Sequence, residues 1–221
     1  MNIIQLRQLL KERFPALRTN PEEFSSDTRP LWSTGLGQID ALLQGGFAKG
    51  ALTEIVAERC GAGSALLACS LLRQAAQAGQ IVAFIDGADS LEVTHLEESA
   101  LSRLLWVRCH SAAEALKATD LLLRDGNVPL VLLDIPINPE KQLRAIPATT
   151  WYRLQRLIEE TSTVCIVLTP RAMVSPAHDR IFLHSRFSLD SLEQDQDELL
   201  SDLKLEAAEM RRFNELEASA S

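Results

Sequence analysis

Several features that point directly to a function are scarce in this chain of 221 residues. Positive charge is one of them: 22 basic side chains stand against 30 acidic ones, a net charge of −8 at pH 7. The chain therefore lacks the strong positive field of a stand-alone nucleic-acid binder. Its ten glycines and nine prolines are too few for a fibrous or low-complexity chain. No apolar run approaches the ~20 residues that span a bilayer.

Paired metal ligands are also missing. The four cysteines, Cys60, Cys69, Cys109 and Cys165, all lie more than three residues apart, and the four histidines show no metal spacing. We expect neither a zinc site nor any other metal or cofactor. The first 17 residues mix charges into their apolar positions, unlike a signal peptide. These features predict a cytoplasmic protein with reduced thiols.

What the chain does have is enough apolar sequence for a sizeable core, 46% of its residues. Residues 3–14 are predicted to form a short amphipathic helix, with Ile3, Leu6 and Leu10 on one face. Three prolines and several turn formers between residues 15 and 30 are typical of a linker. We interpret residues 1–30 as an N-terminal helical arm that leads to a separate body.

From residue 31 onward, short apolar runs alternate with helical patterns. This alternation predicts an α/β fold, a mostly parallel twisted sheet with helices on both faces, over residues 31–190. Each run is expected to be covered on both faces. The predicted strands are Leu52–Val56, Ile81–Ile85, Leu104–Val107, Leu130–Asp134 and Val164–Thr169, and the predicted helices are Ser64–Ala78, Ala112–Arg124 and Thr150–Glu160.

The C-terminal part carries most of the net negative charge, with ten acidic and three basic side chains over residues 187–221. Arg180–Leu189 is β-rich and is expected to form an antiparallel edge pair. Residues 191–221 are predicted to be an acidic helical tail, with one helix over 196–216. Its apolar stripe consists of Leu200, Leu203, Ala207, Met210 and Phe213.

The turn between the first strand and helix of the body occupies the place of a phosphate-binding loop. The functional motif is G-x-x-x-x-G-K-[ST], and the corresponding residues run from 57 to 64. Ala57 and Ala62 replace the two glycines, Gly63 replaces the lysine, and only Ser64 matches. The lysine neutralises the terminal phosphates, and the glycines let backbone N–H groups close around them. We therefore expect a vestigial loop retained for packing.

Several segments resemble the RecA recombinase core, in the same order and with similar spacing over residues 31–190. Residues 32–47 contain Trp-Ser-Thr-Gly, Ile-Asp-Ala-Leu-Leu and Gly-Gly-Phe, similar to the opening segment of that core. Four further segments show the same similarity. Residues 50–55 resemble the strand before its phosphate loop, and residues 83–86 resemble the strand next to its catalytic acid. Residues 131–134 resemble its Walker B strand, and residues 180–187 resemble the strands that follow its second DNA loop.

The departures from this resemblance concern function. Ala88 stands where the resemblance places the catalytic glutamate, and Thr169 stands where it places the phosphate-sensing glutamine. Asp134 matches the Walker B acid, which we interpret as a vestigial strand-end residue. The second DNA loop would correspond to residues 170–180, which have two prolines and no glycine. These departures imply no ATPase activity and weak or indirect nucleic-acid binding.

Among RecA-like proteins without nucleotide chemistry, the chain most resembles the ImuA family, on residues 45–54 and the degenerate loop that follows them. The resemblance implies a non-enzymatic accessory protein of damage-induced (SOS) translesion mutagenesis. Its partners would be the RecA recombinase, an ImuB-like polymerase subunit, or both. Three alternatives stay open: a SulA-like inhibitor of the division protein FtsZ, an ATPase with an atypical phosphate loop, and a self-associating scaffold. The candidate partner-binding residues are Ile3, Leu6, Leu10, Leu200, Leu203, Met210 and Phe213.

Overall fold

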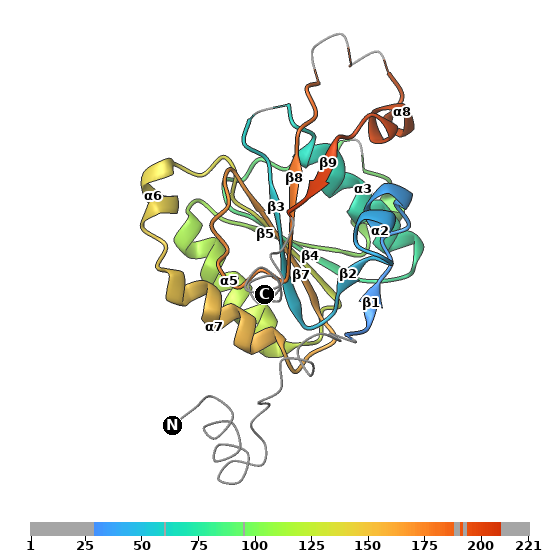
Figure 1. Cartoon of the computed structure of the whole chain (residues 1–221). Coiled ribbons are helices and arrows are strands. Elements are labelled where there is room, and N and C mark those ends of the chain that lie inside the picture. Colours follow the sequence, from blue (N-terminus) through green and yellow to red (C-terminus); the bar gives the residue numbers. More distant parts are fainter. Residues whose placement is uncertain (1–28, 60, 95, 188–190, 192–193, 209–221) are drawn as a thin grey trace, which may run out of the picture. The chain divides into compact units, whose positions relative to one another are not determined.

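A seven-stranded sheet with helices on both faces forms the body of the protein (Figure 1). The computed structural model describes residues 29–208 except 60, 95, 188–190 and 192–193. The chain divides into two compact units, Met1–Pro30 and Leu31–Ser221, and the sheet belongs to the second. The predicted helix over 3–14, with Ile3, Leu6 and Leu10, lies outside the described residues.

The strand order in the sheet is β5-β4-β6-β7-β3-β8-β9, and all neighbours are parallel except β8 and β9. This arrangement confirms the predicted mostly parallel α/β fold. Five predicted strands are present with ends within about one residue of the expected ones. The strands are β3 (Ala51–Val56), β4 (Val82–Asp86), β5 (Leu104–Arg108), β6 (Leu130–Asp134), β7 (Val164–Thr169), β8 (Asp179–Leu183) and β9 (Leu205–Ala207).

The inner strands β3, β4 and β7 are fully buried, as their unbroken apolar sequences predict. The expectation that every strand is covered on both faces is wrong for β5. That strand lies at one edge of the sheet, where its side chains are partly or fully exposed, and Leu105 is 43% exposed. An apolar run by itself does not reveal that a strand has a neighbour on one side only.

Two helical layers cover the sheet, with α3 (Ser64–Gln77) and α2 (Gly37–Leu42) on one face and α5 (Ala112–Asp125) and α7 (Ala148–Ile158) on the other (Figure 1). The predicted helices are confirmed. Ser111 caps α5 by accepting a hydrogen bond from the Glu114 N–H, and Trp151 and Leu154 on α7 are buried. The described helices include none that is both long and apolar enough to cross a membrane.

A second, two-stranded sheet formed by β1 (Leu31–Trp32) and β2 (Phe47–Ala48) flanks α2. The Trp32 and Phe47 rings stack with their centroids 6.2 Å apart. The Asp40 carboxylate accepts hydrogen bonds from the Thr34 N–H and hydroxyl, which fixes the turn before α2. Two further short helices, α4 (Glu98–Leu101) and α6 (Glu140–Arg144), complete the loops.

The C-terminal segment differs from its prediction. The single helix expected over 196–216 is wrong: α8 spans only Gln196–Ser201, and the chain then forms β9 against β8. Apolar spacing at Leu200, Leu203 and Ala207 suits a helix, but the free edge of β8 offers backbone hydrogen bonds that outweigh this local preference. An antiparallel edge pair is present as expected, although β8 ends at Leu183 and its antiparallel partner comes from residues 205–207. Residues 209–221, with Met210 and Phe213, lie outside the described part.

Candidate functional site

The segment from Ala57 to Ser64 connects the carboxyl end of β3 to the start of α3, where sequence analysis placed the vestigial phosphate loop. In open α/β sheets this edge is the usual place for ligands. Ala57 and Ala62 are buried, with 5% and 1% of their surface exposed. Gly63 precedes α3 in a left-handed conformation with φ +98°, and Ser64 is the first helical residue. The strand–turn–helix frame of a phosphate loop is therefore retained.

Side chains from the C-terminal part of the chain fill the space above Gly63. A Cβ atom built on Gly63 would lie only 2.6 Å from Leu203 Cδ2 and 3.0 Å from Phe187 Cε2. The Phe187 N–H also donates a hydrogen bond of 3.0 Å to the Gly61 carbonyl. Leu203 is 7% exposed, so it is part of the packed body. Two apolar side chains thus occupy the space into which a lysine side chain at position 63 would extend.

Two carboxylates lie side by side at the same edge of the sheet, because Asp86 on β4 is in register with Asp134 on β6. The Asp86 carboxylate accepts hydrogen bonds from the Ser90 and Leu91 N–H groups and from Trp106 Nε1. Burial, and then the neighbouring Asp86 charge, raise the pKa of Asp134 to about 7. The Asp134 carboxyl therefore gains a proton near neutral pH.

A third acidic group near this edge is already engaged in an ion pair. Ala88 follows the end of β4, and the next residue, Asp89, pairs with Arg108 through bonds of 2.5 and 2.8 Å. That pairing holds the pKa of Asp89 below its usual value. Among the described residues there is no group of three or more histidine, cysteine, aspartate or glutamate side chains that would hold a metal ion.

A buried glutamate organises the segment that corresponds to the second DNA loop. Glu54, on β3, is fully buried, and its Oε1 accepts hydrogen bonds from the Thr169 hydroxyl and from the Met173 and Val174 N–H groups. Its Oε2 pairs with Arg180 Nε at 2.5 Å. These bonds fix both ends of the short loop between β7 and β8. The sequence signal for this role is the single acidic residue in the strand 51–56, although the sequence alone does not show which groups surround it.

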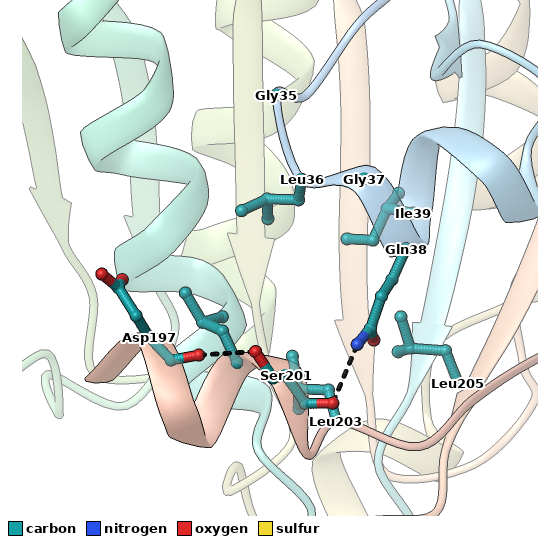
Figure 2. Close-up of a pocket in the computed structure, with 10 residues that line it drawn as sticks. Gly35, Leu36, Gly37, Gln38, Ile39, Asp197, Ser201, Leu203 and Leu205 are labelled. Atoms are coloured by element: carbon teal, nitrogen blue, oxygen red, sulfur yellow. Dashed lines mark hydrogen bonds between the residues drawn. The ribbon is translucent and has the colours of Figure 1, made fainter. Parts of the chain in front are cut away.

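Two of the candidate partner-binding residues of the tail, Leu200 and Leu203, line the same small pocket of about 240 Å³ (Figure 2). Leu203 is buried and also approaches Gly63, whereas Leu200 is only partly buried. One wall of this pocket comes from residues 35–39 and the other from residues 197–205. The two walls are joined by a hydrogen bond of 2.9 Å from Gln38 Nε2 to the Ser201 carbonyl.

Comparison with known proteins shows similarity to RecA in sequence and to a recombinase in fold. The RecA N-terminal domain family model matches residues 21–143. Protein RecA of Desulfotalea psychrophila is 32% identical over 108 residues, 48% of this chain and 30% of that protein. Protein RecA of Deinococcus radiodurans is 33% identical over 105 residues, 46% of this chain and 29% of that protein. The match thus spans about 30% of the length of these curated relatives.

A solved structure, that of the RadB recombinase, has the same fold, with a TM-score of 0.52 at 21% sequence identity. The similarity covers 68% of this chain and 81% of the RadB chain. The family match includes β3, the degenerate loop, and the strands that carry Asp86 and Asp134. This chain therefore belongs to the RecA N-terminal domain family.

Proposed function

We propose that this protein is a non-enzymatic, ImuA-like accessory factor of damage-induced translesion mutagenesis. In this proposal a cytoplasmic RecA-like body acts through protein–protein contacts, with the RecA recombinase, an ImuB-like polymerase subunit, or both as partners. The relationship to RecA supports the choice of partner, because a related body keeps surfaces similar to those by which RecA subunits contact one another.

The observation that carries the proposal is the packing of Leu203 and Phe187 against Gly63. Nucleotide phosphates bound at such a loop need open backbone N–H groups and a lysine. In this chain the lysine is absent, and the space above the loop holds apolar side chains. Ala88, in place of the catalytic glutamate, supports the same conclusion.

Direct DNA binding is not required by this function. The loop at residues 170–178 is fixed to the buried Glu54 through the Met173 and Val174 N–H groups, and Arg180 at its end pairs with the same carboxylate. Arg171 is paired with Glu140. Arg171 and Arg180 already have carboxylate partners, which weakens their electrostatic attraction for the phosphates of a nucleic acid.

Isothermal titration with Mg-ATP tests the enzymatic part of the proposal, with RecA as the positive control. We expect no heat of binding at high protein concentration and no phosphate release over hours. A micromolar affinity that disappears in the Asp134→Ala variant would refute the proposal in favour of an ATPase with an atypical loop.

Binding to immobilised RecA, ImuB-like protein and FtsZ tests the partner. We expect binding to RecA or the ImuB-like protein, unchanged by the addition of ATP to the accessory chain alone. Binding to FtsZ alone would favour division control. Association with itself alone would favour a scaffold, and either result would contradict the proposed function.

A further inference from the structure

The strand β5 has an open edge. Within the described part of the chain, β4 is the only strand that pairs with β5, which lies at one end of the seven-stranded sheet. The register runs from Val82↔Leu104 to Asp86↔Arg108 without a bulge. The sequence of β5, Leu-Leu-Trp-Val-Arg, contains no proline or lysine, and the charge of Arg108 is paired with Asp89. This strand therefore lacks the features that commonly prevent one edge strand from pairing with another.

Exposed apolar side chains lie in or beside this edge. Seven large apolar side chains are exposed among the described residues, and three of these are Leu105 in β5, Ile81 just before β4 and Leu101 at the end of α4, three residues before β5. Their exposed fractions are 43%, 52% and 40%. Another strand added at this edge would both bond the outward backbone groups and cover apolar surface.

The hydrogen bonds to β4 determine which backbone groups of β5 point outward. The Arg103 carbonyl accepts a hydrogen bond of 3.0 Å from the Val82 N–H, and the Cys109 N–H donates one of 2.8 Å to the Asp86 carbonyl. Because successive residues of a strand direct their N–H and C=O groups to opposite sides, the odd-numbered residues of this segment bond to β4. The residues that direct these groups outward are the even-numbered ones, Leu104, Trp106 and Arg108.

This arrangement is complementary to itself. When two copies pair antiparallel about a two-fold axis at Trp106, the two Trp106 residues lie opposite each other, and Leu104 lies opposite Arg108 of the second copy. Opposite residues of this kind exchange both of their backbone hydrogen bonds. Leu105 then lies opposite Val107, on the face covered by α5, because Val107 packs against the core cluster under that helix. Aromatic and apolar cross-strand pairs stabilise such a pairing, and no like charges lie directly opposite each other.

We propose that β5 is a dimerisation edge, at which a second copy of this chain adds its own β5 antiparallel, about a two-fold axis at Trp106, so that the two sheets become one. An interface of this isologous kind closes at two subunits. Two five-residue strands make a contact that is small beside the ~1,200–2,000 Å² of stable interfaces. The dimer is therefore reversible and depends on protein concentration. It is independent of the proposed function, because it involves only copies of this chain.

Analytical ultracentrifugation of the full chain over a range of concentrations tests the dimer. We expect a monomer–dimer equilibrium for the unmodified chain. Leu105→Lys places a charge against Val107 of the second copy and should raise the dissociation constant of the dimer at least tenfold. Leu121→Lys is the matched control, because Leu121 is also an exposed leucine but lies on α5, and it should leave the constant unchanged. A monomer at every concentration, or equal constants for the two variants, would overturn the proposal.

Disulfide trapping tests the register of the two strands. The double variant Leu105→Cys with Val107→Cys brings thiols of the two copies opposite each other in a non-hydrogen-bonded pair. The Cα atoms of such a pair are ~4.5 Å apart, which suits a disulfide, so we expect mild oxidation to produce a covalent dimer on a non-reducing gel. Leu104→Cys with Val107→Cys, whose side chains lie on opposite faces, should give no more covalent dimer than the unmodified chain. Equal yields for the two double variants would overturn the register.

Binding of RecA and of the ImuB-like protein to the same samples separates this proposal from the proposed function. A dimer that binds neither protein would support the β5 pairing and refute only the proposed function. A monomeric chain that binds one of them and loses this binding in Leu105→Lys would overturn the dimer in favour of a strand from another protein as the occupant of the edge.

Discussion

Substitution of Gly63 by alanine measures how tightly the space above the loop at residues 57–64 is packed. Gly63 and Gly79 both have left-handed backbones, with φ of +98° and +73°. A Cβ atom on Gly63 would approach Leu203 Cδ2 to 2.6 Å and Phe187 Cε2 to 3.0 Å, whereas a Cβ on Gly79 would meet nothing within 4 Å. Gly79→Ala is therefore the matched control, because it has the same kind of backbone strain and no packing conflict.

The expected magnitudes follow from these two environments. A non-glycine residue in the left-handed region costs about 1–2 kcal/mol, offset by the roughly 0.4–1 kcal/mol that alanine gains by restricting the unfolded chain. Both variants share this net cost. Gly63→Ala adds overpacking against Leu203 and Phe187, which costs about 1–3 kcal/mol. At roughly 2–4 °C per kcal/mol for a chain of this length, Gly63→Ala should melt at least about 2 °C below Gly79→Ala.

Urea and thermal unfolding, followed by circular dichroism, provide the assay. The Leu203→Ala variant alone should lose about 2–4 kcal/mol of unfolding free energy through cavity formation. In the Leu203→Ala background, Gly63→Ala should cost little more unfolding free energy than Gly79→Ala. The reason is that Gly63 and Leu203 are in contact, so the effects of substituting them are coupled. Equal losses for the two glycine variants, or an excess that persists without Leu203, would refute the packing of the loop.

Three further predictions follow from the carboxylates and the charge distribution. Because the pKa of Asp134 is raised from 3.8 to about 7, the folded state binds the extra proton and stability falls as the pH rises from 4 to 7. Asp134→Asn should therefore raise the unfolding free energy at pH 8 by roughly 2–4 kcal/mol and change it little at pH 4. A lower unfolding free energy of this variant at pH 8, measured by urea titration, would contradict the prediction. Glu54→Ala should lower the unfolding free energy by about 3–5 kcal/mol, because it leaves Arg180 and buried N–H groups without their acceptor. The exposed Glu140→Ala control should lose far less, because solvent screens ion pairs at the surface, and similar losses for both variants would show that Glu54 does not organise its loop. Fluorescence anisotropy should detect only weak, strongly salt-dependent binding to single- and double-stranded oligonucleotides, and sub-micromolar binding at physiological salt would contradict the expectation drawn from the net charge.

The sequence by itself determined the parallel sheet and the departures from the phosphate-loop motif. Strands such as 130–134 and 164–169 are unbroken apolar runs, which are typical of strands buried on both faces in any tertiary context. The departures at Gly63 and Ala62 are read directly from a motif with fixed spacing. Both kinds of signal are local, so they need no knowledge of the rest of the fold.

Only the tertiary structure decided how the acidic C-terminal segment folds and packs. The spacing of Leu200, Leu203 and Ala207 predicts a helix, yet Leu205–Ala207 form a strand because β8 has a free edge there. The same pairing brings Leu203 to Gly63, about 140 residues away in the chain. The pairing of an edge strand and the filling of a space depend on residues that are distant in sequence. The apolar periodicity of one segment carries no information about those residues. Likewise, the role of Glu54 became visible only when the fold brought Thr169, Val174 and Arg180 around its carboxylate.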